Sequence, residues 1–172
     1  MNGFSQTQEK ILAPVGLGFI ILSLFIAFML NIMPWGRVYG VPDFLALVLI
    51  FWCIYQGHRI GIGTAFCLGV LMDVNNATFL GETALAYTLM VYFAITLHKQ
   101  ILWFSPAKQI WYVLLLLFIP PVVEIVIQFI AGNWITDGFW IFDCVVGAII
   151  WPLIHWLLMW PQRKIERTEA KI

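Results

Sequence analysis

The stretch GVLMDVNNATFLGE, residues 69 to 82, places a carboxylate and two amides inside a strongly apolar chain. Asp73, Asn75 and Asn76 close an apolar run that begins at Ile60, and Glu82 opens the next run. On insertion scales a charged side chain at the centre of a membrane helix costs about 2.5–3.5 kcal/mol. We therefore expect this stretch to face protein or a polar pocket rather than lipid tails.

The composition of the whole chain supports a membrane setting. Of its 172 residues, 62% are hydrophobic and only 10% are charged, which is too little polar surface to cover a soluble core of that size. We predict one all-α integral membrane domain, residues 1–172, in contact with membrane lipid. The net charge of zero makes nucleic acid an unexpected partner. Cys53, Cys67 and Cys144 lie in apolar runs and are predicted to be small buried side chains.

Six apolar runs are predicted to be transmembrane helices joined by short loops, since about 20 residues cross the hydrocarbon core. The predicted spans are about 11–33, 43–57, 60–78, 82–98, 107–131 and 138–160, followed by a basic tail at 161–172. The second run is short enough to suit a re-entrant segment nearly as well. Pro120-Pro121 should bend the fifth span.

The placement of basic residues favours six spans over five. Six spans put eight basic residues at one set of helix ends and only Arg37 at the other. The eight are Lys10, Arg59, Lys99, Lys108, Arg163, Lys164, Arg167 and Lys171. By the positive-inside rule, both termini are then cytoplasmic.

Small residues and acids recur at helical spacing on three of these spans. Gly61, Ala65, Gly69 and Asp73 share one face of the third span, because residues four apart stack on one side of a helix. Small residues on such a face let another helix approach closely. The candidate helix-contact face is Gly61, Ala65, Gly69, Gly147 and Trp151, and it packs either within the chain or against a partner.

The acids gather near the outer ends of the predicted spans. The candidate outward-facing pocket consists of Asp73, Asn75, Asn76, Glu82, Glu124 and Asp143. Because asparagine tolerates left-handed backbone, we predict that the third span is partly broken near its outer end. The alternative is that Asp73 caps the next turn and the two asparagines lie in an ordinary exposed loop.

Motifs of catalysis are missing from the sequence. It contains no nucleophile elbow, Walker loop, paired metal-ligand motif or glycine-rich dinucleotide turn. We expect no catalytic residue, cofactor or metal, and no enzymatic activity.

Several motifs in order resemble the family of bacterial rod shape-determining proteins, MreD. They include Ile32-Met33-Pro34-Trp35, Pro42-Asp43, and Gly63-x-x-Phe66-x-x-Gly69-x-x-x-Asp73 followed by Leu80-Gly81. Trp151-Pro152-Leu153-Ile154 before Arg163-Lys164 also fits. Relatives often carry glycine in the turn after the aspartate, where this chain has Ala77.

The resemblance implies a function in the bacterial inner membrane. Proteins of this family are non-enzymatic members of the cell-elongation (Rod) machinery for peptidoglycan synthesis, and they bind the single-span protein MreC. Through MreC they connect to MreB, RodA and its penicillin-binding transpeptidase, and an assembly with two copies each of the chain and MreC is expected. Their fold is similar to that of substrate-binding subunits of energy-coupling-factor vitamin transporters. Binding a vitamin as such a subunit is therefore the alternative function.

Overall fold

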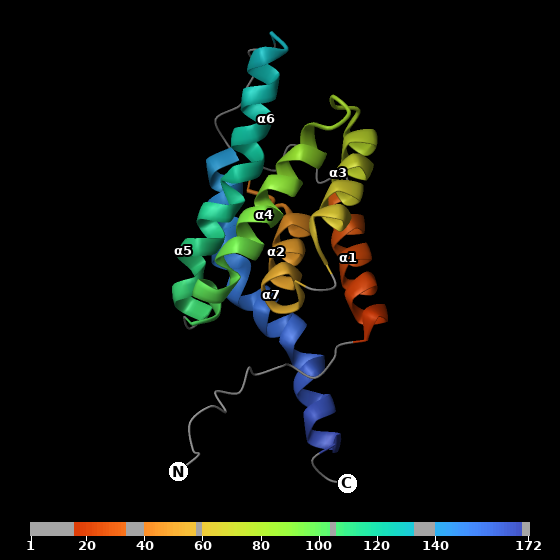
Figure 1. The fold of residues 1–172 in the computed structure, drawn as a ribbon, viewed down its shortest axis with the longest axis vertical. Coiled ribbons are helices and arrows are strands. Elements are labelled where there is room, and N and C mark those ends of the chain that lie inside the picture. Colours follow the sequence, from red (N-terminus) through yellow and green to blue (C-terminus); the bar gives the residue numbers. More distant parts are fainter. Residues whose placement is uncertain (1–15, 34–39, 58–59, 104–105, 133–139, 170–172) are drawn as a thin grey trace, which may run out of the picture.

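The computed structural model describes residues 16–33, 40–57, 60–103, 106–132 and 140–169, and the regular structure within these ranges is all helical, without a strand. Figure 1 shows the helices gathered into an elongated bundle. The helices are α1 (Leu17–Ile32), α2 (Phe44–Gln56), α3 (Ile62–Asn76), α4 (Glu82–Leu102), α5 (Pro106–Leu117), α6 (Ile119–Ile130) and α7 (Trp140–Glu169).

Helix α2 forms the centre of the bundle, although it is among the shortest helices. Its residues from Leu45 to Ile54 are all buried, and it contacts α1, α4, α5 and α7. A helix that is apolar all round lies either in a protein core or in lipid, and the burial of these ten residues places α2 in the core. Its 13 residues reach only roughly 20 Å at 1.5 Å per residue, which is less than the roughly 30 Å thickness of the hydrocarbon core.

The predicted fifth span is interrupted between α5 and α6 at Phe118, two residues before Pro120, and its bend stays a prediction. Pro121 has no N–H to donate to the Leu117 carbonyl one turn earlier. The thiol of Cys144 on α7 donates to that carbonyl instead, at 3.2 Å. The interruption is therefore also a contact point between this span and α7.

Helix length separates the spans into two groups. Three stretches of the described helices are long and apolar enough to cross a membrane: Glu82–Leu102, Gln109–Ile130 and Trp140–Trp160. Helices α1 and α2 are shorter apolar helices, and α3 has 15 residues. The all-helical, membrane-type fold is thus established, and the count of six spans stays a prediction.

Some helix boundaries differ from those expected. Helix α4 continues to Leu102, and α7 continues past Pro161 to Glu169, so most of the predicted tail is helical. Residues 11–15 of the predicted first span lie outside the described residues. The prediction that all three cysteines are buried was wrong for Cys67, which is exposed on α3, whereas Cys53 and Cys144 are buried.

Candidate functional site

The Asp73 carboxylate lies inside the protein and binds the beginning of α4. It is 1% exposed. Its Oδ2 accepts hydrogen bonds from the backbone N–H of Gly81 at 2.8 Å and of Ala84 at 3.4 Å. Its Oδ1 accepts from the N–H of Thr83 at 2.7 Å and from the Thr78 hydroxyl at 3.3 Å. The first N–H groups of a helix lack partners within it and carry partial positive charge, so a carboxylate is a suitable cap.

Gly69 lies one helical turn before Asp73 on α3 and lets α3 contact the backbone of α4. A Cβ at Gly69 would lie 2.4 Å from the Cα of Ala84 and 2.9 Å from the Thr83 carbonyl oxygen. Only glycine fits such an approach without moving one of the helices. The close packing along α3 therefore lies within the chain and holds Asp73 at the start of α4.

The predicted break in the third span was wrong. Helix α3 is continuous through Asp73 and ends at Asn76, and the residue in left-handed conformation is Ala77, with φ of 52°. The Asp73 carbonyl accepts the N–H groups of Ala77 and Thr78, which closes the helix end. Asn75 and Asn76 are exposed, as the capping alternative expects, but they end α3 instead of lying in a loop. The Asn75 side-chain amide donates to the Asn76 side-chain oxygen at 3.1 Å.

A polar pocket of about 330 Å³ lies beside this junction. Residues from the α1–α2 connection and from α3, α4, α6 and α7 line it, together with the end of α5. Its polar lining residues are Asn31, Asp43, Asn76, Thr83, Tyr87, Glu124 and Asp143, and no Lys, Arg or His is among the described residues that line it. Thr83 connects the pocket to the cap, because its N–H donates to Asp73.

The Asp43 carboxylate accepts hydrogen bonds from three of the helices that line the pocket. Its Oδ1 accepts from the N–H of Ala46 at 2.9 Å, which caps α2, and from the side-chain amide of Asn31 at 2.7 Å. Its Oδ2 accepts from the hydroxyl of Tyr87 on α4 at 2.5 Å. The Asn31 oxygen in turn accepts the N–H of Phe44 at 3.1 Å. One carboxylate thereby joins α1, α2 and α4.

The other acids differ in how they are satisfied. Asp143 accepts the N–H of Gly40 at 2.8 Å, so it fixes the connection between α1 and α2 onto α7. Glu82 is 3% exposed and accepts from the side-chain amide of Gln128 at 2.8 Å, which ties α4 to α6. Glu124 lines the pocket, and no hydrogen bond joins its carboxylate to another described residue.

The sequence-predicted pocket residues therefore divide into two sets. Asn76, Glu124 and Asp143 line the pocket, whereas Asp73, Asn75 and Glu82 do not. Asn31, Asp43 and Tyr87 were absent from the predicted set, although Asp43 is one of the acids near the outer ends of the predicted spans. The Pro42-Asp43 signal could have found Asp43, since a helix-capping carboxylate has lone pairs left for other donors.

The predicted helix-contact face is made of separate contacts. Ala65 and Trp151 are fully buried, and a Cβ on Gly147 would lie 3.0 Å from Leu117 Cδ1. A Cβ on Gly61 would meet nothing within 4 Å, so that position leaves room for a side chain.

Comparison with known proteins identifies the family. The family model described as rod shape-determining protein MreD matches residues 12–162, which is most of the chain. The chain belongs to the MreD family. The rod shape-determining protein MreD of Haemophilus influenzae is 29% identical over 155 residues, covering 86% of this chain and 93% of the relative. No solved structure matches the chain.

The match to the MreD family includes the whole polar pocket. Every lining residue lies between Asn31 and Cys144, inside the matched range of 12–162. The chain is thus a member of a rod shape-determining family with membrane-type helices, and its pocket lies within the range that the family model matches.

Proposed function

We propose that this chain is a non-enzymatic scaffold of the Rod complex in the bacterial inner membrane and that it binds MreC directly. Membership of the MreD family supports a function in rod shape determination. The acid-lined pocket at the junction of α1, α2, α4, α6 and α7 is the observation that favours binding over catalysis. Its hydrogen bonds join helices, which suits a rigid docking body.

The pocket chemistry indicates what part of MreC is recognised. Asp43 and Asp143 already accept hydrogen bonds from within the chain, whereas Glu124 has none to a described residue. A carboxylate in such a site gains most from a cation, because charge-assisted hydrogen bonds are about twice as strong as neutral ones. We infer that a basic residue of MreC next to its membrane span pairs with Glu124.

Co-purification of MreC tests the pairing. The change Glu124→Gln keeps the shape of the side chain and removes its charge. Losing one partner of a desolvated pair costs about 2–5 kcal/mol, so recovery of MreC should fall at least thirtyfold at limiting concentration. Glu166→Gln on the tail of α7 is the matched control and should leave recovery unchanged. Equal recovery with both variants would contradict the docking site.

The same scaffold accounts for the wider assembly. With MreC bound, the chain connects to MreB, to RodA and to its penicillin-binding transpeptidase, and we propose two copies each of the chain and MreC. The excess of Lys and Arg at one set of helix ends supports six spans with cytoplasmic termini. A vitamin-binding transporter subunit would instead retain a small molecule in the pocket through purification and leave MreC behind.

A further inference from the structure

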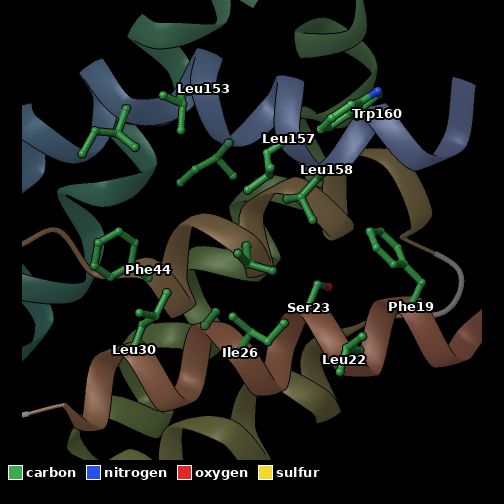
Figure 2. Close-up of a pocket in the computed structure, with 14 residues that line it drawn as sticks. Phe19, Leu22, Ser23, Ile26, Leu30, Phe44, Leu153, Leu157, Leu158 and Trp160 are labelled. Atoms are coloured by element: carbon green, nitrogen blue, oxygen red, sulfur yellow. The ribbon is translucent and has the colours of Figure 1, made fainter.

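A second, larger hollow lies on another side of the molecule, between α1 and α7. It is an apolar groove of about 600 Å³, with Phe44 and Val48 of α2 at its floor. Figure 2 shows Leu22 and Ile26 on one wall and Leu153 and Leu157 on the other. Its one hydroxyl, on Ser23, already donates to the Ile20 carbonyl and accepts from the Trp52 indole. An occupant of this groove therefore meets mostly hydrocarbon, with the Trp160 indole at one end.

The groove is as long as one leaflet of a bilayer. From Phe19 to Leu30 along α1 the distance is roughly 16 Å at 1.5 Å per residue. That is about half of the roughly 30 Å hydrocarbon thickness. A transmembrane helix would need a surface over the full thickness, whereas one lipid chain needs a single leaflet.

The lining also favours a flexible chain over a helix. Membrane helices pack closely where small residues let their backbones approach. The groove walls carry mostly Leu, Ile, Phe and Trp, with Ala27 and Ser23 as the small residues. Such walls leave an irregular space that a chain of methylene groups can fill.

One end of the groove leads toward the α7 extension after Trp160, whose basic residues, Arg163, Lys164 and Arg167, outnumber its acids, Glu166 and Glu169, by one. Figure 2 places Phe19 and Trp160 at the same end. Leu153, Leu157 and Trp160 lie three or four residues apart on one face of α7. The next position on that face is 164, a lysine, and Arg163 and Arg167 belong to the same helical extension. Each basic residue near an anionic membrane surface contributes about 1 kcal/mol to attraction. Trp160 is of the residue type that marks the membrane interface.

We propose that the α1–α7 groove holds an acyl chain of an anionic phospholipid, with its phosphate group at the basic extension of α7. The proposal rests on the membrane setting of the chain and not on the binding of MreC. The lipid would fill the space between α1 and the rest of the bundle, since α1 packs mainly on α2.

Native mass spectrometry of the full chain in detergent tests the proposal. The probes are palmitoyl-oleoyl phosphatidylglycerol and the phosphatidylcholine with the same acyl chains. We expect the wild type to bind phosphatidylglycerol about fivefold better. Ile26→Trp, which fills the groove, should lower that binding about fivefold, whereas Ile21→Trp, on the same helix outside the groove lining, should not. Equal binding by the two tryptophan variants would overturn the proposal.

The head-group contact has its own variant and control. Combined substitution Arg163→Gln, Lys164→Gln and Arg167→Gln should remove the preference for phosphatidylglycerol, and Lys99→Gln at the end of α4 should keep it. A benzophenone amino acid placed at Leu153 should form a phospholipid adduct in membranes. A protein adduct at that position, or an unchanged preference in the triple variant, would contradict the lipid site.

Discussion

Asp73 acts as a long-range cap: one carboxylate accepts three backbone N–H groups of the turn that begins α4 and one hydroxyl. Removing it would leave several donors without partners in a buried place. A buried donor that loses its acceptor costs about 1–3 kcal/mol, and hydrogen bonds to charged groups lie at the upper end. The cap also joins the end of α3 to the beginning of α4.

Replacement of Asp73 should therefore be much more harmful than replacement of its polar neighbour. We expect Asp73→Ala to lower the free energy of unfolding by about 2–4 kcal/mol, from lost charged hydrogen bonds and stranded donors. The exposed Asn75→Ala should stay within about 0.5 kcal/mol. Thermal unfolding of the purified protein in detergent measures both, and similar midpoints for the two variants would rule out the cap.

Ala77 is the one described residue other than glycine with positive φ, at 52°. Left-handed backbone costs an L-residue about 1–2 kcal/mol, which glycine avoids. After allowance for the greater freedom of glycine in the unfolded chain, Ala77→Gly should raise stability by about 0.5–1 kcal/mol. Ala131→Gly, at the end of α6 with φ of −73°, should not raise it. A lower unfolding midpoint for Ala77→Gly would show that the turn carries no strain.

The burial of Asp73 could be predicted from sequence, because lipid is a poor environment for a carboxylate. The sequence could not identify the hydrogen-bond donors to its carboxylate, since a cap on the next turn and a broken helix would both provide them. The Asn75-Asn76 pair favoured the break. In the structure the Asp73 carbonyl closes the end of α3, and the left-handed residue is Ala77. The close approach of α3 to α4 at Gly69 is what selects the cap over the broken helix.

At the scale of elements, the close crossing of α3 and α4 depends on glycine at position 69, which has no side chain. A Cβ on Gly69 would meet the backbone of Ala84 at 2.4 Å, and backbone cannot move aside as a flexible side chain can. The sequence predicted this face from its small residues but could not say which helix covers it. The short length of the second run made it the least certain span in the sequence analysis. In the structure it is α2, the helix that the other helices enclose, which its length could not indicate.

Substitution by alanine should distinguish two glycines of the same helix. Gly69→Ala should lower the free energy of unfolding by about 1–3 kcal/mol, since α3 and α4 must separate. Gly63→Ala meets nothing within 4 Å and should raise it by up to about 1 kcal/mol through helix propensity. Unfolding midpoints and yields from membranes check the pair, and equal stability of the two variants would contradict the contact.

At the scale of the whole molecule, the pocket brings together residues far apart in the chain. Asn31, Asp43, Glu124 and Asp143 come from four segments, and no local pattern relates them. Sequence reasoning placed Glu124 and Asp143 near one membrane face by counting spans, which is why it found them. It missed Asn31 and Tyr87, because a lone Asn or Tyr near a helix end has no signature until the fold supplies its partner.

The central claim is that the acid-lined pocket opens to the periplasm while the basic extension of α7 lies in the cytoplasm. Site-directed cysteine labelling with a membrane-impermeant maleimide tests it, in a Cys67→Ala background because that thiol is exposed. In cells with a permeabilised outer membrane, the Asn75→Cys variant should be labelled at once, and the Arg167→Cys variant only after the inner membrane is lysed. Labelling of the Arg167→Cys variant before lysis, with the Asn75→Cys variant protected, would contradict the account.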